Sequence, residues 1–181
     1  MSYDIKVNII RSPDQHDWNR CKDLALHTIG KRWTNSKVTE EWKQRMLKCK
    51  HSPIRTLMFT IEMEIPYFSS VHFSRHKFGV EHYVESQRND RQSKYDREQA
   101  PQNSMVIHTM DINAAALMNM SHFRLCSQSD ATTRIIMEKI CQAVIETNPE
   151  FEGHLIPMCW FLGDCPEFKP CGRHLRVNLA R

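Results

Sequence analysis

Glycine is scarce in this chain of 181 residues, with five copies at positions 30, 79, 153, 163 and 172. No two of them are close enough to form G-x-G-x-x-G or G-x-x-x-x-G-K-[ST]. The sequence therefore excludes both the dinucleotide-binding fingerprint and the P-loop. If this protein binds a nucleotide, cationic and hydrogen-bonding side chains must replace the usual glycine-rich cradle.

Long apolar runs are also lacking. No stretch approaches the roughly 20 residues of a membrane span, and the opening MSYDIKVNII has no basic segment followed by an apolar one. We therefore expect no signal peptide, no membrane partner and a cytoplasmic location. In a reducing compartment the seven cysteines would be free thiols or metal ligands rather than disulfides.

The composition is that of a globular protein, with 40% hydrophobic and 25% charged residues. Lysine and arginine total 25 against 21 acidic residues, a net charge of +4. This mild excess suits a small anionic ligand and does not require a nucleic-acid partner, so we expect none.

The apolar pattern predicts one α+β domain at residues 1–156, followed by a cysteine-rich tail at residues 157–181. Strict alternation predicts strands at residues 5–9 and 57–65. Helical spacing and capping residues predict five helices, at about 14–29, 40–50, 66–76, 111–123 and 130–148, with caps that include Thr39, Asp111 and Ser129 or Asp130. Residues 77–104 show no regular pattern and are expected to form a loop.

The densest group of chemically active side chains lies between Phe73 and Arg91, in FSRHKFGVEHYVESQRNDR. Arginine forks bind phosphate through paired hydrogen bonds, and lysine adds a point charge. The segment could therefore hold a polyphosphate without glycines. It could equally be a solvated, charged loop, although the periodic segments on either side favour a loop that lines a pocket.

Three motifs resemble the flavin-dependent thymidylate synthases. They are HSPIRTLMFTIEMEIPYFSSVHFSRHK (51–77), APQN (100–103) and NAAALMNMSHFR (113–124). The first is similar to the family's H-x-T/S-P segment, strand, helix and R-H-R motif. The third is similar to its N-A-R-x-L-M-N-x-x-x-x-R helix. The motifs occur in the family's order and cover about the middle half of the chain.

The resemblance implies an antiparallel sheet with flanking helices, assembled as a homotetramer whose active sites lie between subunits. It also implies a reaction, in which dUMP becomes dTMP. Methylene-tetrahydrofolate supplies the carbon, and FAD reduced by NADPH supplies the hydride. The flavin would carry the redox chemistry while the protein provides position and charge.

The resemblance also assigns roles to individual residues. Arg124 would contact the uracil and favour ionisation of its N3 as C5 becomes nucleophilic. Ser86 would share the catalytic role. The expected cofactor-binding residues are Ser52, His51, Arg75, His76, Lys77, Glu85, Asn113 and Asn119. The expected substrate-binding residues are His72, Arg75, Glu85, Ser86, Gln87, Arg88 and Arg124.

The sequence departs from the family pattern at four places. Lys77 replaces the second arginine of R-H-R, and the interval from Lys77 to Ser86 is one residue longer. Ile107 stands at the position of a phosphate-binding arginine, and Ala115 at that of a flavin-binding arginine. Two alternatives stay open. One is modification of another pyrimidine nucleotide, such as hydroxymethylation. The other is a non-enzymatic nucleotide or nucleic-acid binder.

The tail contains a possible metal site in the pattern C-x5-C-x5-C-x2-H, formed by Cys159, Cys165, Cys171 and His174. Three thiolates and an imidazole can hold a structural Zn²⁺ in a tetrahedron. The alternative is three unlinked thiols. Cys126 lies close to Arg124 in the sequence and could be a reactive thiol, although packing is the favoured interpretation.

Overall fold

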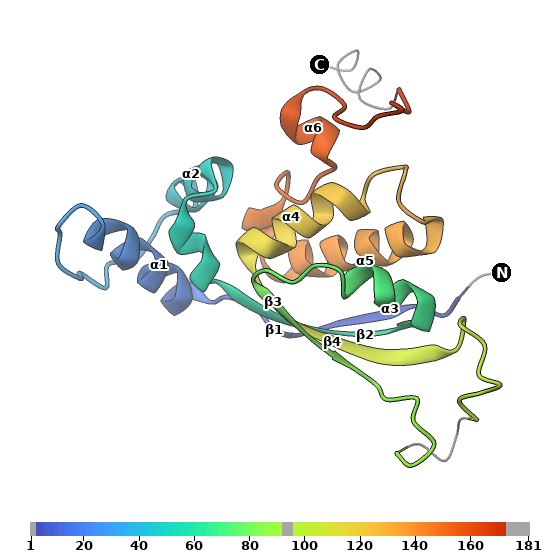
Figure 1. Cartoon of the computed structure of the whole chain (residues 1–181). Helices are drawn as coiled ribbons and strands as arrows, with labels where there is room; N and C mark the ends of the chain where they lie inside the picture. Colours follow the sequence, from blue (N-terminus) through green and yellow to red (C-terminus); the bar gives the residue numbers. More distant parts are fainter. Residues whose placement is uncertain (1–2, 92–95, 173–181) are drawn as a thin grey trace.

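The computed structural model describes residues 3–91 and 96–172. Four strands form an antiparallel sheet in the order β1–β2–β4–β3 (Figure 1). Their bounds are Lys6–Arg11 (β1), Met58–Pro66 (β2), Val80–Val84 (β3) and Met105–Asn113 (β4). The strands predicted near residues 5–9 and 57–65 are thus confirmed as β1 and β2.

Helices α3, α4 and α5 cover one face of the sheet, while α1 and α2 lie together at one end of it (Figure 1). The helices are α1 (Gln15–His27), α2 (Glu40–Cys49), α3 (Tyr67–Phe73), α4 (Ala114–Arg124), α5 (Ala131–Thr147) and α6 (Met158–Leu162), with short 3-10 helices η1 (Ser52–Thr56) and η2 (Pro149–Phe151). The domain is therefore α+β, as expected. Among the described residues, no helix is both long enough and apolar enough to cross a bilayer.

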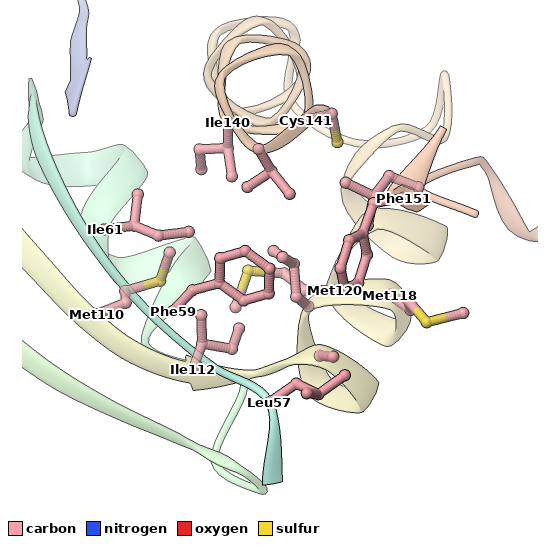
Figure 2. Close-up of a cluster of buried hydrophobic side chains, with 14 of the residues drawn as sticks. Leu57, Phe59, Ile61, Met110, Ile112, Met118, Met120, Ile140, Cys141 and Phe151 are labelled. Carbon is pink, nitrogen blue, oxygen red and sulfur yellow. The ribbon is translucent and has the colours of Figure 1, made fainter. Parts of the chain in front are cut away.

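The core lies between the sheet and helices α4 and α5 (Figure 2). Alternate residues of β2, from Phe59 to Ile65, are fully buried, whereas their neighbours are half-exposed. Phe59 meets Phe151 edge to face at 5.2 Å, and Ile140 of α5 packs above the same face. Burial of an aliphatic or aromatic side chain contributes about 1.5–3 kcal/mol, so this strand contributes strongly to stability.

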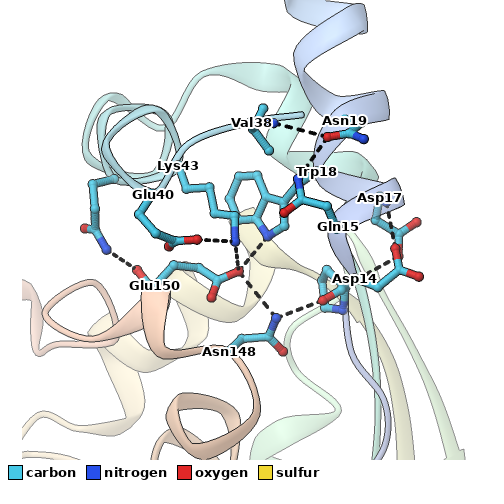
Figure 3. A network of polar contacts seen from close by, with 12 residues as sticks. Asp14, Gln15, Asp17, Trp18, Asn19, Val38, Glu40, Lys43, Asn148 and Glu150 are labelled. Carbon is cyan, nitrogen blue, oxygen red and sulfur yellow. Dashed lines mark hydrogen bonds and ion pairs between the residues drawn. The ribbon is translucent and has the colours of Figure 1, made fainter. Parts of the chain in front are cut away.

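A buried polar network joins α1, α2 and η2 at the end of the sheet (Figure 3). The Trp18 indole Nε1 donates to Glu150 Oε1 at 2.6 Å, and Lys43 Nζ lies 3.5 Å from the same oxygen. The Asn148 side chain donates to the Pro13 carbonyl at 2.8 Å. Because each buried charge has a partner, the network can hold these helices together without an unpaired ion.

The predicted caps at Thr39 and Asp130 are confirmed, but the cap predicted at Asp111 is wrong. Asp111 lies within β4, where its carboxylate accepts a hydrogen bond from Thr60 Oγ1 at 2.6 Å. β2 pairs with β4 along its whole length, so α4 begins only after this pairing ends. Asn113 caps it by accepting from the Ala116 amide at 2.9 Å.

Two other predictions need correction. The segment 77–104 is not all loop, because its residues Val80–Val84 form β3 at the edge of the sheet. The helix that follows Pro66 ends at Phe73 rather than near residue 76. For the tail from Pro157 no secondary structure was predicted, and the structure shows the short helix α6 there.

Candidate functional site

The Arg124 guanidinium, at the C-terminal end of α4, is held by the end of α3 and the residues after it. Its Nε donates to His76 Nε2 at 3.0 Å, and its Nη2 donates to the His72 carbonyl at 2.7 Å. His72 Nδ1 in turn lies 3.1 Å from Thr133 Oγ1 on α5. Within residues 3–91 and 96–172, Nη1 makes no hydrogen bond, so it stays available for a ligand.

Two further histidines support this group from β3 and β4. His82 Nε2 lies 2.8 Å from the His76 carbonyl, and His82 Nδ1 lies 2.9 Å from His108 Nε2. A carbonyl only accepts hydrogen bonds, so in neutral rings His82 carries its proton on Nε2 and accepts one from His108. This leaves His108 Nδ1 as a buried acceptor with no partner in the described chain.

Burial keeps two of these histidines uncharged. Desolvation, together with the smaller effects of the Arg124 charge and of His82, lowers the pKa of His76 to about 4. Desolvation and His82 likewise lower the pKa of His108 to about 4. Near neutral pH, His76 is therefore a neutral, hydrogen-bonding ring and not a cation.

The positive charge of the site comes instead from Arg124 and Arg75. Burial lowers the pKa of the half-buried Arg124, and the nearby charge of Arg75 lowers it further. Within the described residues, neither guanidinium forms an ion pair. Two like charges close together and unneutralised favour the binding of an anion between or beside them.

A separate cleft of about 530 Å³ lies where β3 ends. Its wall includes the four consecutive residues 85–88, which were predicted to bind the substrate, together with Tyr67, Arg97 and Gln102. The Ser86 hydroxyl accepts a hydrogen bond from the Arg88 amide at 3.3 Å. The Gln87 Nε2 is buried without a partner in the part of the chain that is described, so it could donate to a ligand in the cleft.

Two of the predicted substrate-binding groups in this cleft are already engaged. The Glu85 carboxylate accepts from the Ile107 amide at 3.1 Å, and the Glu85 amide donates to the Ile107 carbonyl at 2.8 Å. Arg88 pairs with Asp90 through two bonds of 2.9 and 2.7 Å. To bind a phosphate, Arg88 would have to exchange this exposed ion pair for the ligand.

The structure thus separates the predicted site residues into two groups. His72, Arg75, His76 and Arg124 form one group, which we call the arginine–histidine cluster. Glu85, Ser86, Gln87 and Arg88 form the other, in the cleft, whose wall contains no member of the cluster. Helix α3 links them, with Tyr67 at the cleft and His72 at the cluster.

The remaining predicted cofactor-binding residues lie mainly on the surface. Lys77 and Asn119 are exposed, as are His51 and Ser52 at η1, which contacts α4. Asn113 is different, because its side chain caps α4. The exposed members offer amide, hydroxyl and cationic donors of the kind that a flavin dinucleotide requires, and no aspartate or glutamate is among them.

The structure adds to both groups residues that were not among the predicted site residues. His82 and His108 connect β3 and β4 to the cluster, and Arg97 and Gln102 line the cleft. For His82 there was a signal, because it alternates with Val80 and Val84 in a strand-like pattern. Gln102 belongs to the APQN motif, whereas for Arg97 there was no signal, since only the folding of the β3–β4 connection brings it to the cleft.

The metal site predicted in the tail is only partly within the described structure. Cys159, Cys165 and Cys171 line one small cavity, and Cys126 lies in its wall as well. His174 lies outside the described residues. The predicted packing of Cys126 is consistent with its half-buried position.

Comparison with known proteins gives a likeness of fold. No family model matches the sequence, and no curated protein matches it. Among solved structures, the chain is similar to the UMP/dUMP methylase PolB from Streptomyces cacaoi bound with 5-Br dUMP, with a TM-score of 0.64 and 14% identity over 84% of this chain and 97% of that one. A structure of the same methylase bound with 5-Br UMP has a TM-score of 0.60 and 16% identity, over 86% and 97%.

Proposed function

We propose that this chain methylates C5 of dUMP to give dTMP, using methylene-tetrahydrofolate, FAD and NADPH. The main support is the pair of neighbouring arginines, Arg75 and Arg124, which have no acidic partner among the described residues. His76 and the His72 carbonyl fix the position of Arg124. The likeness to a UMP/dUMP methylase supports a pyrimidine nucleotide as the anion. The sequence motifs support the flavin-dependent chemistry.

Arg124 would stabilise negative charge on the pyrimidine. Its Nε and Nη2 are held by protein acceptors, so the guanidinium is already oriented before the substrate arrives. A fixed, half-buried cation beside N3 favours the ionised ring, and the added electron density makes C5 a better nucleophile. Neutral His76 orients Arg124 and does not compete with it for the anion.

FAD would bind through the exposed side chains of His51, Ser52, Lys77 and Asn119. When bound, this cofactor supplies the hydride that completes the methyl group. The protein groups have the simpler tasks of hydrogen-bonding the cofactor and neutralising its phosphates. Lys77 provides a point charge there, since it lacks the fork of an arginine.

In an assembly of several copies, the cleft of one copy would help to bind the nucleotide held by the arginine–histidine cluster of a neighbouring copy. In one chain Ser86 and Gln87 lie in the cleft, apart from the arginine–histidine cluster. The homotetramer implied by the sequence resemblance would bring the cleft of one copy to the cluster of another. We therefore include self-association in the proposal.

A second candidate is the modification of another pyrimidine nucleotide on the same fold. One similar structure is a methylase bound with 5-Br UMP, a ribonucleotide analogue. In this chain Ile107 stands where the family has an arginine, and its backbone is bonded to Glu85. Phosphate and sugar contacts could therefore differ from those of a dUMP enzyme.

The cofactor proposal can be tested by visible absorption spectroscopy. Purified protein, as isolated or after addition of FAD and desalting, should retain a yellow flavin spectrum near one FAD per chain. Lys77→Gln should weaken FAD binding several-fold, whereas Lys48→Gln, which removes an exposed lysine from α2, should not. A folded protein that retains no FAD would contradict the flavin-dependent proposal.

A further inference from the structure

Four of the seven cysteines line one small cavity beside α6. Cys126 follows the end of α4, Cys159 lies in α6, and Cys165 and Cys171 lie in the segment after it. The sequence pattern at 159–174 contained only three of these thiols, because Cys126 is 33 positions before Cys159 in the chain. Folding adds the fourth.

The four thiols are also close enough for three of them to affect the pKa of the fourth, Cys159. Burial raises the pKa of the Cys159 thiol, and Cys165, Cys126 and Cys171 each raise it further. None of the four forms a disulfide. The other three cysteines are elsewhere: Cys21 and Cys141 are buried, and Cys49 is exposed on α2.

The tail that carries three of these cysteines is held against the turn between α4 and α5. Gln128 Nε2 donates to the Lys169 carbonyl at 3.0 Å, and Cys126 Sγ lies 3.9 Å from Glu167 Oε1. Gly163 and Gly172 have φ angles of +77° and +74°, a backbone conformation that glycine adopts readily. Gly163 ends α6, so the chain changes direction between Cys159 and Cys165.

We propose that Cys126, Cys159, Cys165 and Cys171 together bind one structural Zn²⁺ ion. Four thiolates satisfy the tetrahedral coordination of a closed site and leave no open position for chemistry. Each thiol loses its proton when it becomes a ligand. The ion would fix residues 157–172 to the end of α4. This revises the ligand set predicted from the sequence, with Cys126 in place of His174.

Metal binding would draw the four sulfurs closer together. With Zn–S bonds of about 2.3 Å, tetrahedral sulfurs lie about 3.8 Å apart. Among the described residues, only Asp14, His16 and Asp17 form a group of three potential metal ligands whose ligand atoms all lie within 4.8 Å of one another. No three of the four cysteine sulfurs lie that close together. Asp14 and Asp17 form the capping box of α1, so their arrangement already has an explanation. Residues 163–172 would therefore have to move when the ion binds, so that the sulfurs reach these distances.

The site would act on the arginine–histidine cluster only indirectly. Arg124 is the last residue of α4 and precedes Cys126 by two positions. An ion bound to Cys126 would stiffen this helix end, and with it the backbone of Arg124. The zinc proposal does not depend on the proposed reaction, since a structural ion could serve any function of this fold.

Metal analysis of protein purified without added metal or chelator tests the proposal directly. We expect about one zinc per chain, and its replacement by Co²⁺ should give the intense thiolate and ligand-field bands of a tetrahedral four-sulfur site. Less than about one-tenth zinc per chain in folded protein that also fails to bind Co²⁺ would overturn the proposal. Disulfides among these cysteines, detected by mass spectrometry after alkylation, would also overturn it.

Single substitutions identify the ligands. Serine at position 126, 159, 165 or 171 should lower the zinc content or weaken affinity at least tenfold, while Cys49→Ser should have no effect. His174→Ala should retain the metal. Zinc lost from His174→Ala but kept by Cys126→Ser would reject this ligand set in favour of three cysteines and a histidine. The Co²⁺ spectrum of the unmodified protein gives the same distinction if a variant does not fold.

Discussion

Arg124 makes two hydrogen bonds whose acceptors come from the end of α3 and the residue positions just after it. Its neighbours His76 and His82 are connected by another bond, so the guanidinium is supported through a chain of contacts rather than by a carboxylate. A carboxylate would neutralise the cation and weaken its attraction for a nucleotide. Support by neutral groups fixes the side chain and leaves its charge unpaired.

Arg124→Lys should therefore lower kcat/KM for dUMP by at least about a hundredfold, because lysine keeps the charge but cannot reproduce both bonds. Steady-state kinetics measures this effect, and the far-ultraviolet circular dichroism of the variant checks its folding. Arg45→Gln is the matched control, since Arg45 is exposed on α2 and pairs only with Glu41. Equal losses in both variants would contradict a specific role for Arg124.

His108 should make the stability of the protein depend on pH. Its pKa is lowered to about 4 in the folded state from 6.5, so the unfolded chain binds the proton at higher pH. The corresponding stability is complete above about pH 6.5 and is lost as pH falls toward 4. At ~1.4 kcal/mol per pKa unit, lowering the pH from 7 to 5 should remove about 2 kcal/mol.

Urea unfolding of wild type and His108→Gln at pH 7 and pH 5 measures this contribution. The wild type should lose more stability between the two values than the variant does. His16→Gln, at an exposed position on α1, should behave as the wild type. An unchanged pH dependence in His108→Gln would show that His108 does not cause the effect.

At the level of elements, the junction between β4 and α4 depends on a close contact with the residue that precedes β3. Gly79 has a φ of +74°, and a Cβ there would collide with the side-chain amide of Asn113 and lie 3.1 Å from the Ala116 Cβ. The Asn113 side chain caps α4, and the Asn113 backbone amide donates to the Gly79 carbonyl at 2.9 Å. Glycine is needed at this position for its conformation and also for space.

Gly79→Ala should lower the free energy of unfolding by about 2–4 kcal/mol, the sum of backbone strain and a clash with the cap. Gly153→Ala is a matched control, because Gly153 has a φ of +76° and nothing within 4 Å of the added methyl. It should lose only about 1 kcal/mol. Denaturant unfolding compares the two, and losses of equal size would rule out the steric contribution at Gly79.

Local patterns predicted the elements whose signals lie within a few residues. Thr39 and Asp130 cap their helices through contacts three residues away, and β2 alternates because one of its faces is buried. β3 and β4 were not predicted, although Val80, His82 and Val84 alternate in β3. β3 is an edge strand whose inner position holds His82, and Asp111 looks like a cap until β2 is known to pair beside it.

The candidate site shows the same division. The motif resemblance selected Arg124, His72, Arg75 and His76, and the structure brings these residues together. The resemblance did not predict that burial leaves His76 neutral or that Arg88 pairs with Asp90, because both depend on the environment in the folded chain. The fourth thiol of the proposed zinc site was likewise distant in the sequence from the other three.

At the scale of the whole molecule, the chain has a four-stranded sheet with one face covered by α3, α4 and α5, and two groups of polar residues at different places on it. Its fold is similar to that of a UMP/dUMP methylase over most of its length. We propose that the nucleotide binds between the cleft of one copy and the arginine–histidine cluster of an associated copy.

The most direct test is to identify the product of a reaction that contains the purified protein, dUMP, methylene-tetrahydrofolate, FAD and NADPH. Mass spectrometry should detect dTMP, which is heavier than dUMP by one CH₂ group, and omission of FAD from flavin-free protein should abolish it. Parallel reactions with UMP and dCMP distinguish the second candidate. If folded, FAD-loaded protein forms no dTMP from dUMP, the central claim is contradicted.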